Sequence, residues 1–403
     1  MRCRVKITGI GPVTPAGIGR EAFFNGINES ISRVRVLRNL DQEAGPFIGA
    51  EIVDFDLKRY APDENPRRLS RHTQFGLVGT ILALQDAGLK AEDLGALDPV
   101  IVTGTSTMDI DKMSRGVQVV TKKGPRHSVA STIFETSIVN VPGRIAKYLG
   151  VQARMFALQS SCCSGLDAIG QAAELVASGQ TKIAVTGGCE APLSFHPMLE
   201  FNAAELNPTS YEHPEKSCRP FDLWRSTGVL GEGAAMFILE PESSPRPAYA
   251  WVTGYGYAND PNGTAAMGIS DAVQRSLANA CRRLEDVDYI SAWGPGHRVI
   301  DANEAFALKR TFGARLANIP VSSIKGSVGT ALGAAGAMQT ASAALSLARG
   351  LLPPTVNWVT PDPNCALNLS GQRRYIAAKV ALVNSHGLSG SNASLVLEKI
   401  CPS

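Results

Sequence analysis

The 403-residue sequence lacks any long hydrophobic run, because no apolar stretch reaches the roughly 18 to 20 residues that a membrane span needs. It has little net charge, with 39 Lys and Arg against 36 Asp and Glu, which excludes a protein that coats a polyanion. Its eight cysteines match no zinc-ligand spacing and no disulfide scaffold. The first residues contain no apolar signal core. These absences predict a cytoplasmic protein with reduced thiols and without a metal, a nucleic-acid partner or a membrane partner.

What the sequence does contain is an alternation of short β-branched runs and amphipathic segments. Runs such as RVKITGI, TKIAVTG and KVALVNS predict strands, and segments such as RHTQFGLVGTILALQDAG and SGLDAIGQAAELVASG predict helices. Strands that alternate with helices are typical of α/β folds whose sheets are covered on both faces. A hydrophobic fraction of 44% is enough for a sizeable core. The sequence therefore predicts a globular α/β protein.

The chain also shows a weak internal repeat. Each half holds about five predicted strands and ends on a similar one after a small-residue run, GEGAAMFILE in the first half and GSNASLVLEK in the second. A Ser/Pro-rich linker at residues 242–248 separates the halves. We therefore expect an N-terminal half of residues 1–245 and a C-terminal half of residues 246–403. Two similar halves packed together and two unrelated α/β domains both fit this pattern.

Cys162 lies at a small-residue corner between a predicted strand and a predicted helix, in RMFALQSSCCSGLDAIGQAAELVASG. The positive end of a helix dipole lowers the pKa of a thiol, and the free N–H groups there can bind a developing oxyanion. Cys162 is therefore a candidate nucleophile. The alternative is that Cys162 and Cys163 are small buried hydrophobic residues, as most free cysteines are.

Four segments carry a family resemblance. SSCCSGLDAIG resembles the active-site elbow of β-ketoacyl-acyl-carrier-protein synthases, and CRPFDLWRSTGVLGEGAAMFILE resembles their RPFD…GEGA block. SSIKGSVGTALGAAG resembles their lysine-bearing loop, and NSHGLSGSNASLVLE resembles their C-terminal Gly-rich turn. The resemblance runs from Lys6 to Lys399 and is closest to the elongating synthases of fatty-acid and type II polyketide pathways.

This resemblance implies an α/β fold of the duplicated thiolase type, layered α-β-α-β-α with two mixed five-stranded sheets. It implies a homodimer, or a heterodimer with a related synthase. It also implies that the substrate is carried on the phosphopantetheine of an acyl carrier protein and that no cofactor is bound.

The chain departs from the family at both active-site histidines. The resemblance implies that these histidines bind the malonyl thioester and stabilise the enolate formed on decarboxylation, but Trp293 and Thr330 stand at their positions. An indole N–H and a hydroxyl can donate hydrogen bonds, yet neither group has a nitrogen that accepts a proton near pH 7. We therefore expect ordinary decarboxylative condensation to be weak or absent.

Other positions keep the residues of the family. Lys325, Glu304 and Asp301 match positions of the family's active site. The resemblance assigns Leu388 as the gating residue, whose N–H joins the N–H of Cys162 in binding an oxyanion. We therefore expect the parts that acylate the cysteine to be intact.

Two histidines are candidates to replace the missing ones. His386 stands at a normally aromatic position near the nucleophile, where it could act as a base or simply form a wall of the pocket. His297, four residues after Trp293, is expected to be a histidine of a surface loop.

Two further segments match surfaces of the family. Arg67 and Arg68, at the start of a predicted helix, match the basic patch that meets the acidic carrier protein, although a solvated helix face explains them equally well. Met108 and Ile110 lie in the region that shapes the dimer interface and the pocket floor. We expect these two side chains to help set the depth of the substrate pocket.

Together these features predict a ketosynthase-like acyltransferase that takes an acyl chain from a carrier protein onto Cys162 in a polyketide- or fatty-acid-like pathway. Non-decarboxylative acyl transfer or an aldol-type cyclisation is favoured for the second step. Two alternatives stay open: a true 3-oxoacyl-acyl-carrier-protein synthase with an unusual site, and a non-catalytic partner like the chain-length factors. Because those factors typically lack the nucleophilic cysteine, which this chain keeps, the sequence favours an enzyme.

Overall fold

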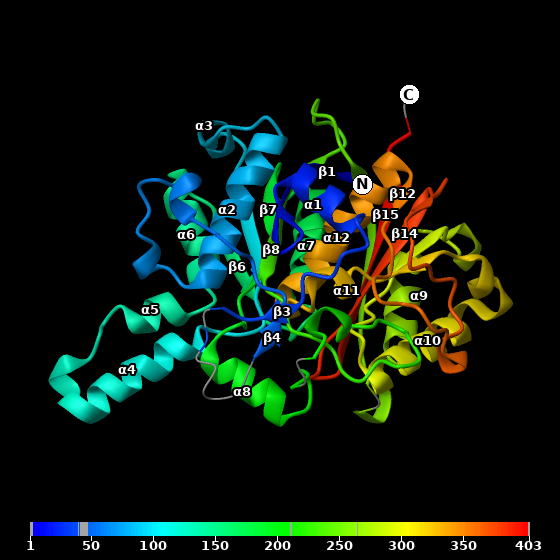
Figure 1. The fold of residues 1–403 in the computed structure, drawn as a ribbon. Coiled ribbons are helices and arrows are strands. Elements are labelled where there is room, and N and C mark those ends of the chain that lie inside the picture. Colours follow the sequence, from blue (N-terminus) through cyan, green and yellow to red (C-terminus); the bar gives the residue numbers. More distant parts are fainter. Residues whose placement is uncertain (1–2, 39, 41–46, 210–211, 264, 402–403) are drawn as a thin grey trace.

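The main strands form two sets of five that follow one another along the chain (Figure 1). The structure is a computed structural model and describes residues 3–38, 40, 47–209, 212–263 and 265–401. In those ranges the first set comprises β1 (Val5–Thr14), β5 (Val100–Gly104), β6 (Arg154–Leu158), β7 (Ala184–Glu190) and β8 (Gly233–Pro241). The second set comprises β9 (Ala250–Asn259), β10 (Tyr289–Ser291), β11 (Val321–Ser322), β14 (Val380–His386) and β15 (Ser391–Lys399). Two-residue strands add β2 (Gly17–Ile18), β3 (Arg35–Val36), β4 (Ile48–Gly49), β12 (Leu351–Leu352) and β13 (Arg374–Tyr375).

Both sets have the same strand order. The first set lies in the spatial order β6-β5-β7-β8-β1, and the second lies in the order β11-β10-β14-β15-β9. When the strands are numbered along the chain within each set, both orders become 3-2-4-5-1. The shared order means that the two halves are similar, so the alternative of two unrelated α/β domains is excluded. The boundary between residues 245 and 246 stays a prediction.

The two sets are joined edge to edge, which the sequence did not predict. Antiparallel pairing of Val5 with Val252, and of Ile7 with Ala250, links β1 to β9. The expected pair of five-stranded sheets is therefore one continuous 11-stranded sheet when β2 is included. This pairing covers the edges that the first strand of each half would otherwise expose.

Helices cover both faces of the two strand sets. They are α1 (Arg20–Ile27), α2 (Arg71–Asp86), α3 (Ala91–Gly95), α4 (Ile110–Lys123), α5 (Thr132–Thr136), α6 (Asn140–Leu149), α7 (Ser164–Ala177), α8 (Phe195–Ala203), α9 (Ile269–Asn279), α10 (Arg298–Phe312), α11 (Lys325–Val328) and α12 (Leu332–Arg349). α7 and α12 contact each other and strands of both sets, while α2 covers the first set and α9 covers the second. Figure 1 shows the resulting layers, with α2 and α6 on one side, α7 and α12 in the centre, and α9 and α10 on the other side.

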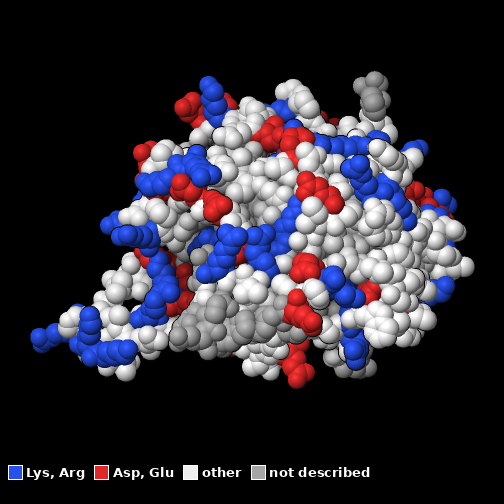
Figure 2. Space-filling model, in the orientation of Figure 1, with Lys and Arg blue, Asp and Glu red and all other residues white. Residues whose placement is uncertain are grey.

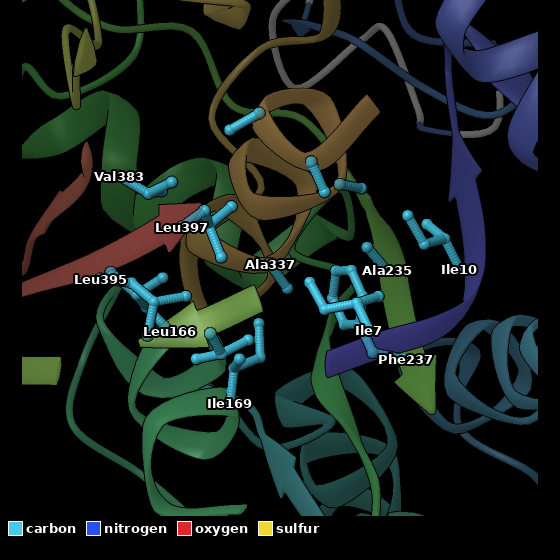
Figure 3. Packing of buried hydrophobic residues seen from close by; sticks show 14 of the residues in the cluster. Ile7, Ile10, Leu166, Ile169, Ala235, Phe237, Ala337, Val383, Leu395 and Leu397 are labelled. Atoms are coloured by element: carbon cyan, nitrogen blue, oxygen red, sulfur yellow. The ribbon is translucent and has the colours of Figure 1, made fainter. Parts of the chain in front are cut away.

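The central helices pack closely because their contact surface consists of small residues. A Cβ atom on Gly165 would lie 2.5 Å from the carbonyl oxygen of Gly333, so a larger residue there would force α7 and α12 apart. Larger apolar side chains such as Leu166, Phe237 and Leu395 fill the space on either side (Figure 3). This packing fixes the N-terminal end of α7, where Cys162 lies.

An arm made of α4 and α5 projects from the body of the molecule (Figure 1). Its apolar side chains Val117, Ile133 and Phe134 are exposed, with 73% of Phe134 accessible to solvent. Among the described residues, no helix is both long enough and apolar enough to cross a bilayer.

Candidate active site

Cys162 lies in a strained elbow between β6 and α7. Ser161 has a φ of 58°, in the left-handed region that non-glycine residues rarely adopt, so the chain turns sharply just before the cysteine. Two hydrogen bonds hold the turn: Ser160 N donates to Ser164 Oγ at 3.0 Å, and Ser391 Oγ donates to Ser160 O at 2.9 Å. Strain at a turn that presents a thiol is typical of a functional site.

The pKa of the Cys162 thiol is higher than the helix dipole alone predicts. Burial raises its pKa to about 11, and the charge of Glu190 acts in the same direction. The Ser161 hydroxyl, the Leu388 N–H and the charge of Lys325 oppose this rise in the pKa. Burial therefore outweighs the lowering of the pKa expected from the helix N-terminus, because only 5% of Cys162 is exposed.

Cys163 is less suited to be the nucleophile. It is fully buried, its Sγ donates to the carbonyl oxygen of Ser391 at 3.5 Å, and burial raises its pKa well above the usual value. Cys163 packs in the hydrophobic core, whereas Cys162 lines a cavity.

The ring of Trp293, at one of the two positions where the resemblance implies a histidine, faces Lys325. The ammonium nitrogen of Lys325 lies 4.1 Å from the centre of the Trp293 ring, a cation–π contact in a buried site. Lys325 Nζ also donates to Gln339 Oε1 at 2.8 Å. Burial lowers the pKa of Lys325 to about 7, while the nearby carboxylate of Glu304 favours the charged form.

Two buried carboxyl groups hold the backbone around Trp293. Glu304 accepts hydrogen bonds from the N–H groups of Trp293 and Gly294, both at 2.8 Å. Asp301 accepts from Phe221 N at 2.7 Å and from Gly296 N at 3.1 Å. Burial raises the pKa of both carboxyls, that of Asp301 to about 7. Both residues therefore fix the loop, and neither touches the sulfur of Cys162.

Gln339 belongs to this site, although the sequence analysis missed it. Its amide nitrogen donates to the carbonyl oxygens of Ser291, Ala292 and Asn384, and its amide oxygen accepts from Lys325. Gln339 is a polar residue in a helix of small residues, and that contrast was the only signal in the sequence.

One narrow cavity of about 50 Å³ brings five of the seven predicted catalytic residues together, whereas Lys325 and Glu304 do not line it. Its lining includes Cys162, Trp293, Thr330, His386 and Leu388, together with the apolar side chains Phe201, Leu206, Val229, Leu230, Ile300 and Leu332. Because one water occupies about 10–15 Å³ on this measure, the cavity has room for a few water-sized groups. An acyl chain needs more space, so side chains must move before a chain can enter. Leu388 is 49% exposed at the mouth of this cavity.

Both replacement histidines lie on the cavity wall. His386 is buried at the end of β14, where its Nδ1 lies 3.0 Å from Asn392 Oδ1, and burial lowers its pKa. His297 caps α10, since its Nδ1 accepts from Val299 N and Ile300 N at 3.2 and 3.3 Å. His297 lies in the loop before α10, as expected, but it is half-buried and lines the cavity.

One predicted pocket residue and one predicted docking residue share a different hollow. Met108 and Arg67 line a surface hollow of about 360 Å³ between the starts of α2 and α4. Ile110 begins α4, and neither Met108 nor Ile110 lines the cavity of Cys162, so their effect on pocket depth stays a prediction. Arg67 and Arg68 are exposed on the turn Pro66–Arg68. Figure 2 shows further Lys and Arg side chains on the protruding α4–α5 arm.

Comparison with known families gives two adjoining matches. The N-terminal domain of β-ketoacyl synthases matches residues 2–244, and the C-terminal domain of β-ketoacyl synthases matches residues 249–359. The tetracenomycin polyketide synthase ketoacyl synthase alpha subunit of Streptomyces glaucescens is 32% identical over 421 residues, covering 98% of this chain and 97% of that protein. The 3-oxoacyl-[acyl-carrier-protein] synthase 2 of Staphylococcus aureus strain N315 is 30% identical over 409 residues, covering 98% of each.

Solved structures extend the likeness to the whole fold. The ishigamide ketosynthase/chain length factor superposes with a TM-score of 0.93 at 26% identity over 100% of both chains. A type II polyketide ketosynthase, bound to the hexaketide and in complex with its acyl carrier protein, superposes with a TM-score of 0.90 at 27% identity, also over 100% of both chains.

Proposed function

The chain belongs to the β-ketoacyl synthase family and has its thiolase-type fold, and from this premise we propose that it is an acyltransferase of a polyketide- or fatty-acid-like pathway. In this proposal Cys162 takes an acyl chain from the phosphopantetheine of an acyl carrier protein. The later step is a non-decarboxylative transfer or an intramolecular cyclisation.

The observation that carries this proposal is the elbow of Cys162. The Cys162 side chain lines the same cavity as Leu388, whose N–H acts to lower the pKa of the thiol. The N–H groups of Cys162 and Leu388 are the proposed oxyanion donors when a thioester carbonyl is attacked. A non-catalytic subunit has no need of a strained turn that presents a thiol to a cavity.

Decarboxylation has little support at this site. Trp293 and Thr330 line the cavity where the family places histidines, and the Trp293 ring contacts the ammonium of Lys325. Neither the indole nor the hydroxyl has a nitrogen that accepts a proton near pH 7. Enolate stabilisation would rest on the indole N–H and the Thr330 hydroxyl, so we propose that transfer or cyclisation replaces malonyl condensation.

Two surfaces of the protein are suited to binding partner proteins. Exposed apolar residues on the α4–α5 arm, with Met155 and Phe156 on the outer edge of β6, favour pairing with a second copy or a related synthase. Arg67 and Arg68 are exposed and suit an acidic carrier protein. One solved relative is a ketosynthase/chain length factor, and another is a ketosynthase in complex with its acyl carrier protein.

A second candidate function is that of a non-catalytic chain-length-factor-like partner. The observation that favours it is the narrow cavity around a buried thiol with a pKa of about 11. Such a subunit would shape a partner's product without carrying an acyl group itself.

Acyl loading separates the two functions. The protein would be incubated with acyl carrier proteins that carry chains of different length, once alone and once together with a co-expressed related synthase. Mass spectrometry would then measure the mass of the intact protein. The proposal predicts a mass gain of one acyl group in the wild type and in Cys163→Ala, and none in Cys162→Ala. No gain with any carrier protein, with or without the related synthase, would contradict acylation and favour the chain-length-factor role.

A further inference from the structure

Asp260, Asn392 and His386 form a buried chain of polar groups beside the candidate nucleophile. Asn392 lies on β15 opposite His386 on β14, and Asp260 directly follows β9. All three side chains are more than nine-tenths buried. Asn392 contacts both of the others: its Nδ2 lies 2.7 Å from Asp260 Oδ1, and its Oδ1 lies 3.0 Å from His386 Nδ1.

The orientation of the Asn392 amide follows from its partners. The Asp260 carboxylate already accepts hydrogen bonds from Gly268 N at 3.0 Å and Ala266 N at 3.2 Å, so it faces Asn392 as an acceptor. Asn392 Nδ2 also lies 3.2 Å from the carbonyl oxygen of Gly390, which can only accept. The amide NH₂ must therefore point toward Asp260 and Gly390, and the amide oxygen must point toward His386.

This orientation decides which nitrogen of His386 carries the proton. Because Asn392 Oδ1 can only accept, His386 Nδ1 must donate and therefore carries the hydrogen. In the neutral ring the lone pair is then on Nε2. Burial lowers the pKa of His386, which favours this neutral form near pH 7. The titratable groups that face the ring in the described part of the chain are Asp260, 3.7 Å from Nδ1, and the cavity residues Cys162 and His297.

Two buried polar atoms of the cavity residues lack partners. Within the described residues, His386 Nε2 and Thr330 Oγ1 make no hydrogen bond. Buried polar groups are nearly always paired, so a cavity lined by two such residues is suited to a polar guest. A hydroxyl group matches both, because its hydrogen can be donated to Nε2 while its oxygen accepts from the Thr330 hydroxyl. A cavity of about 50 Å³ has room for a group of that size.

We propose that Asp260 and Asn392 are positioning residues that hold His386 as a base, and that His386 Nε2 deprotonates a hydroxyl acceptor that attacks the acyl group on Cys162. This inference rests on the proposed function, since it needs an acyl thioester at Cys162. The acceptor class is a small hydroxyl compound, either water or an alcohol.

The step is balanced without a co-reactant. Nε2 takes the hydroxyl proton as the oxygen attacks the thioester carbonyl carbon. The C–O bond forms, the C–S bond breaks, and the sulfur of Cys162 leaves as a thiolate. The thiolate then recovers the proton from Nε2, which restores the neutral ring and releases an ester, or an acid when water is the acceptor.

The first test measures the tautomer directly. Protein labelled with ¹⁵N-histidine would be studied by NMR, and the His386 signals would be assigned by their loss in His386→Phe. We expect a protonated Nδ1 and an unprotonated Nε2 in the wild type, and loss of this preference in Asn392→Leu. A wild-type ring protonated on Nε2 would overturn the proposal.

The second test measures the loss of the acyl group from enzyme already acylated at Cys162. Intact mass would follow the reaction in ¹⁸O-labelled water, and in a parallel arm with ethanol as the alcohol probe. We expect His386→Phe, which keeps a planar ring, to slow the loss by about 10²- to 10⁴-fold. Asn392→Leu should slow it at least about tenfold and shift the pH profile, because it removes the acceptor that fixes the tautomer.

A matched control distinguishes positioning from general damage. Asn384 is also a buried amide in the β14–β15 pair and accepts from Ser394 Oγ at 3.0 Å, so Asn384→Leu should leave the pH profile unchanged. This inference would be overturned if acylated His386→Phe lost its acyl group at a rate within tenfold of the wild-type rate. That result would leave the proposed function standing. No acyl adduct with any donor would overturn both. Labelled oxygen in a released acid identifies water as the acceptor, and an ethyl ester identifies an alcohol.

Discussion

Histidines placed at positions 293 and 330, where the resemblance implies them, should give the site malonyl decarboxylation activity. Trp293 and Thr330 both line the cavity of Cys162, and their backbones are held independently of their side chains. Glu304 accepts from Trp293 N, while Thr330 N donates to the carbonyl oxygen of Val229 at 2.7 Å. An imidazole placed on either backbone should therefore project into the same cavity in the double variant Trp293→His/Thr330→His.

The expected gain follows from the number of donors restored. One preorganised oxyanion donor is typically worth about 10² to 10³ in rate, or roughly 2.7–4 kcal/mol. We therefore expect the double variant to release carbon dioxide from malonyl-acyl carrier protein at least about 100-fold faster than the wild type. Loss of the cation–π contact between Trp293 and Lys325 should cost about 2 kcal/mol of stability and lower Tm by a few degrees.

The assay is carbon dioxide release at saturating malonyl-acyl carrier protein, with Tm measured in parallel. Trp293→Phe/Thr330→Ser is the matched control, because it changes the same two positions without adding a nitrogen that can exchange protons. The reasoning would be refuted by wild-type release as fast as that of a two-histidine synthase. It would also be refuted by a folded double variant that is acylated at Cys162 yet no faster than the control.

Three further results are expected. Alkylation of Cys162 by iodoacetamide should rise about tenfold per pH unit from pH 7 to about pH 10, because burial raises its pKa to about 11; a plateau near pH 8 would contradict the burial argument. Arg67→Glu should raise KM for an acyl chain on its carrier protein by about tenfold but leave KM for a small-molecule thioester unchanged. Arg373→Glu, at another exposed arginine, is the control. Equal effects on both acyl donors would count against docking at Arg67. Phe134→Asp should shift the sedimentation coefficient from that of a dimer toward that of a monomer. Val359 is 78% exposed on the body of the molecule, and Val359→Asp should cause no such shift. An intact dimer in Phe134→Asp would exclude the arm from the interface.

Much of the fold could be predicted because its signals are local. Alternating strand and helix patterns predicted the α/β class, and the linker at residues 242–248 lies between β8 and β9. The edge pairing of Val5 with Val252 could not be predicted, because strand partners distant in the chain leave no periodic trace. The shared strand order of the halves became visible only with the sheet.

At the site, the sequence identified residues but not their environments. It placed Cys162, Trp293, Thr330, His386 and Leu388 near one another, and the structure places them on one cavity. It did not predict the raised pKa of the thiol, because the burial of the sulfur depends on tertiary packing.

The polar contacts behind the cavity were also beyond reach of the sequence. Asp260 is separated from Asn392 by 132 residues, and Gln339 from Lys325 by 14. Polar groups that meet through tertiary packing carry no local pattern, so the tautomer of His386 could be deduced only from the structure.

Locating the acyl group tests the central claim most directly. The protein would be incubated with acyl carrier protein that carries a chain it accepts, digested, and analysed by tandem mass spectrometry of the peptide that contains both Cys162 and Cys163. The account predicts the acyl group on Cys162, with Cys163 unmodified. An acyl group on Cys163 alone, or an unmodified peptide under conditions in which an authentic ketosynthase is acylated, would contradict it.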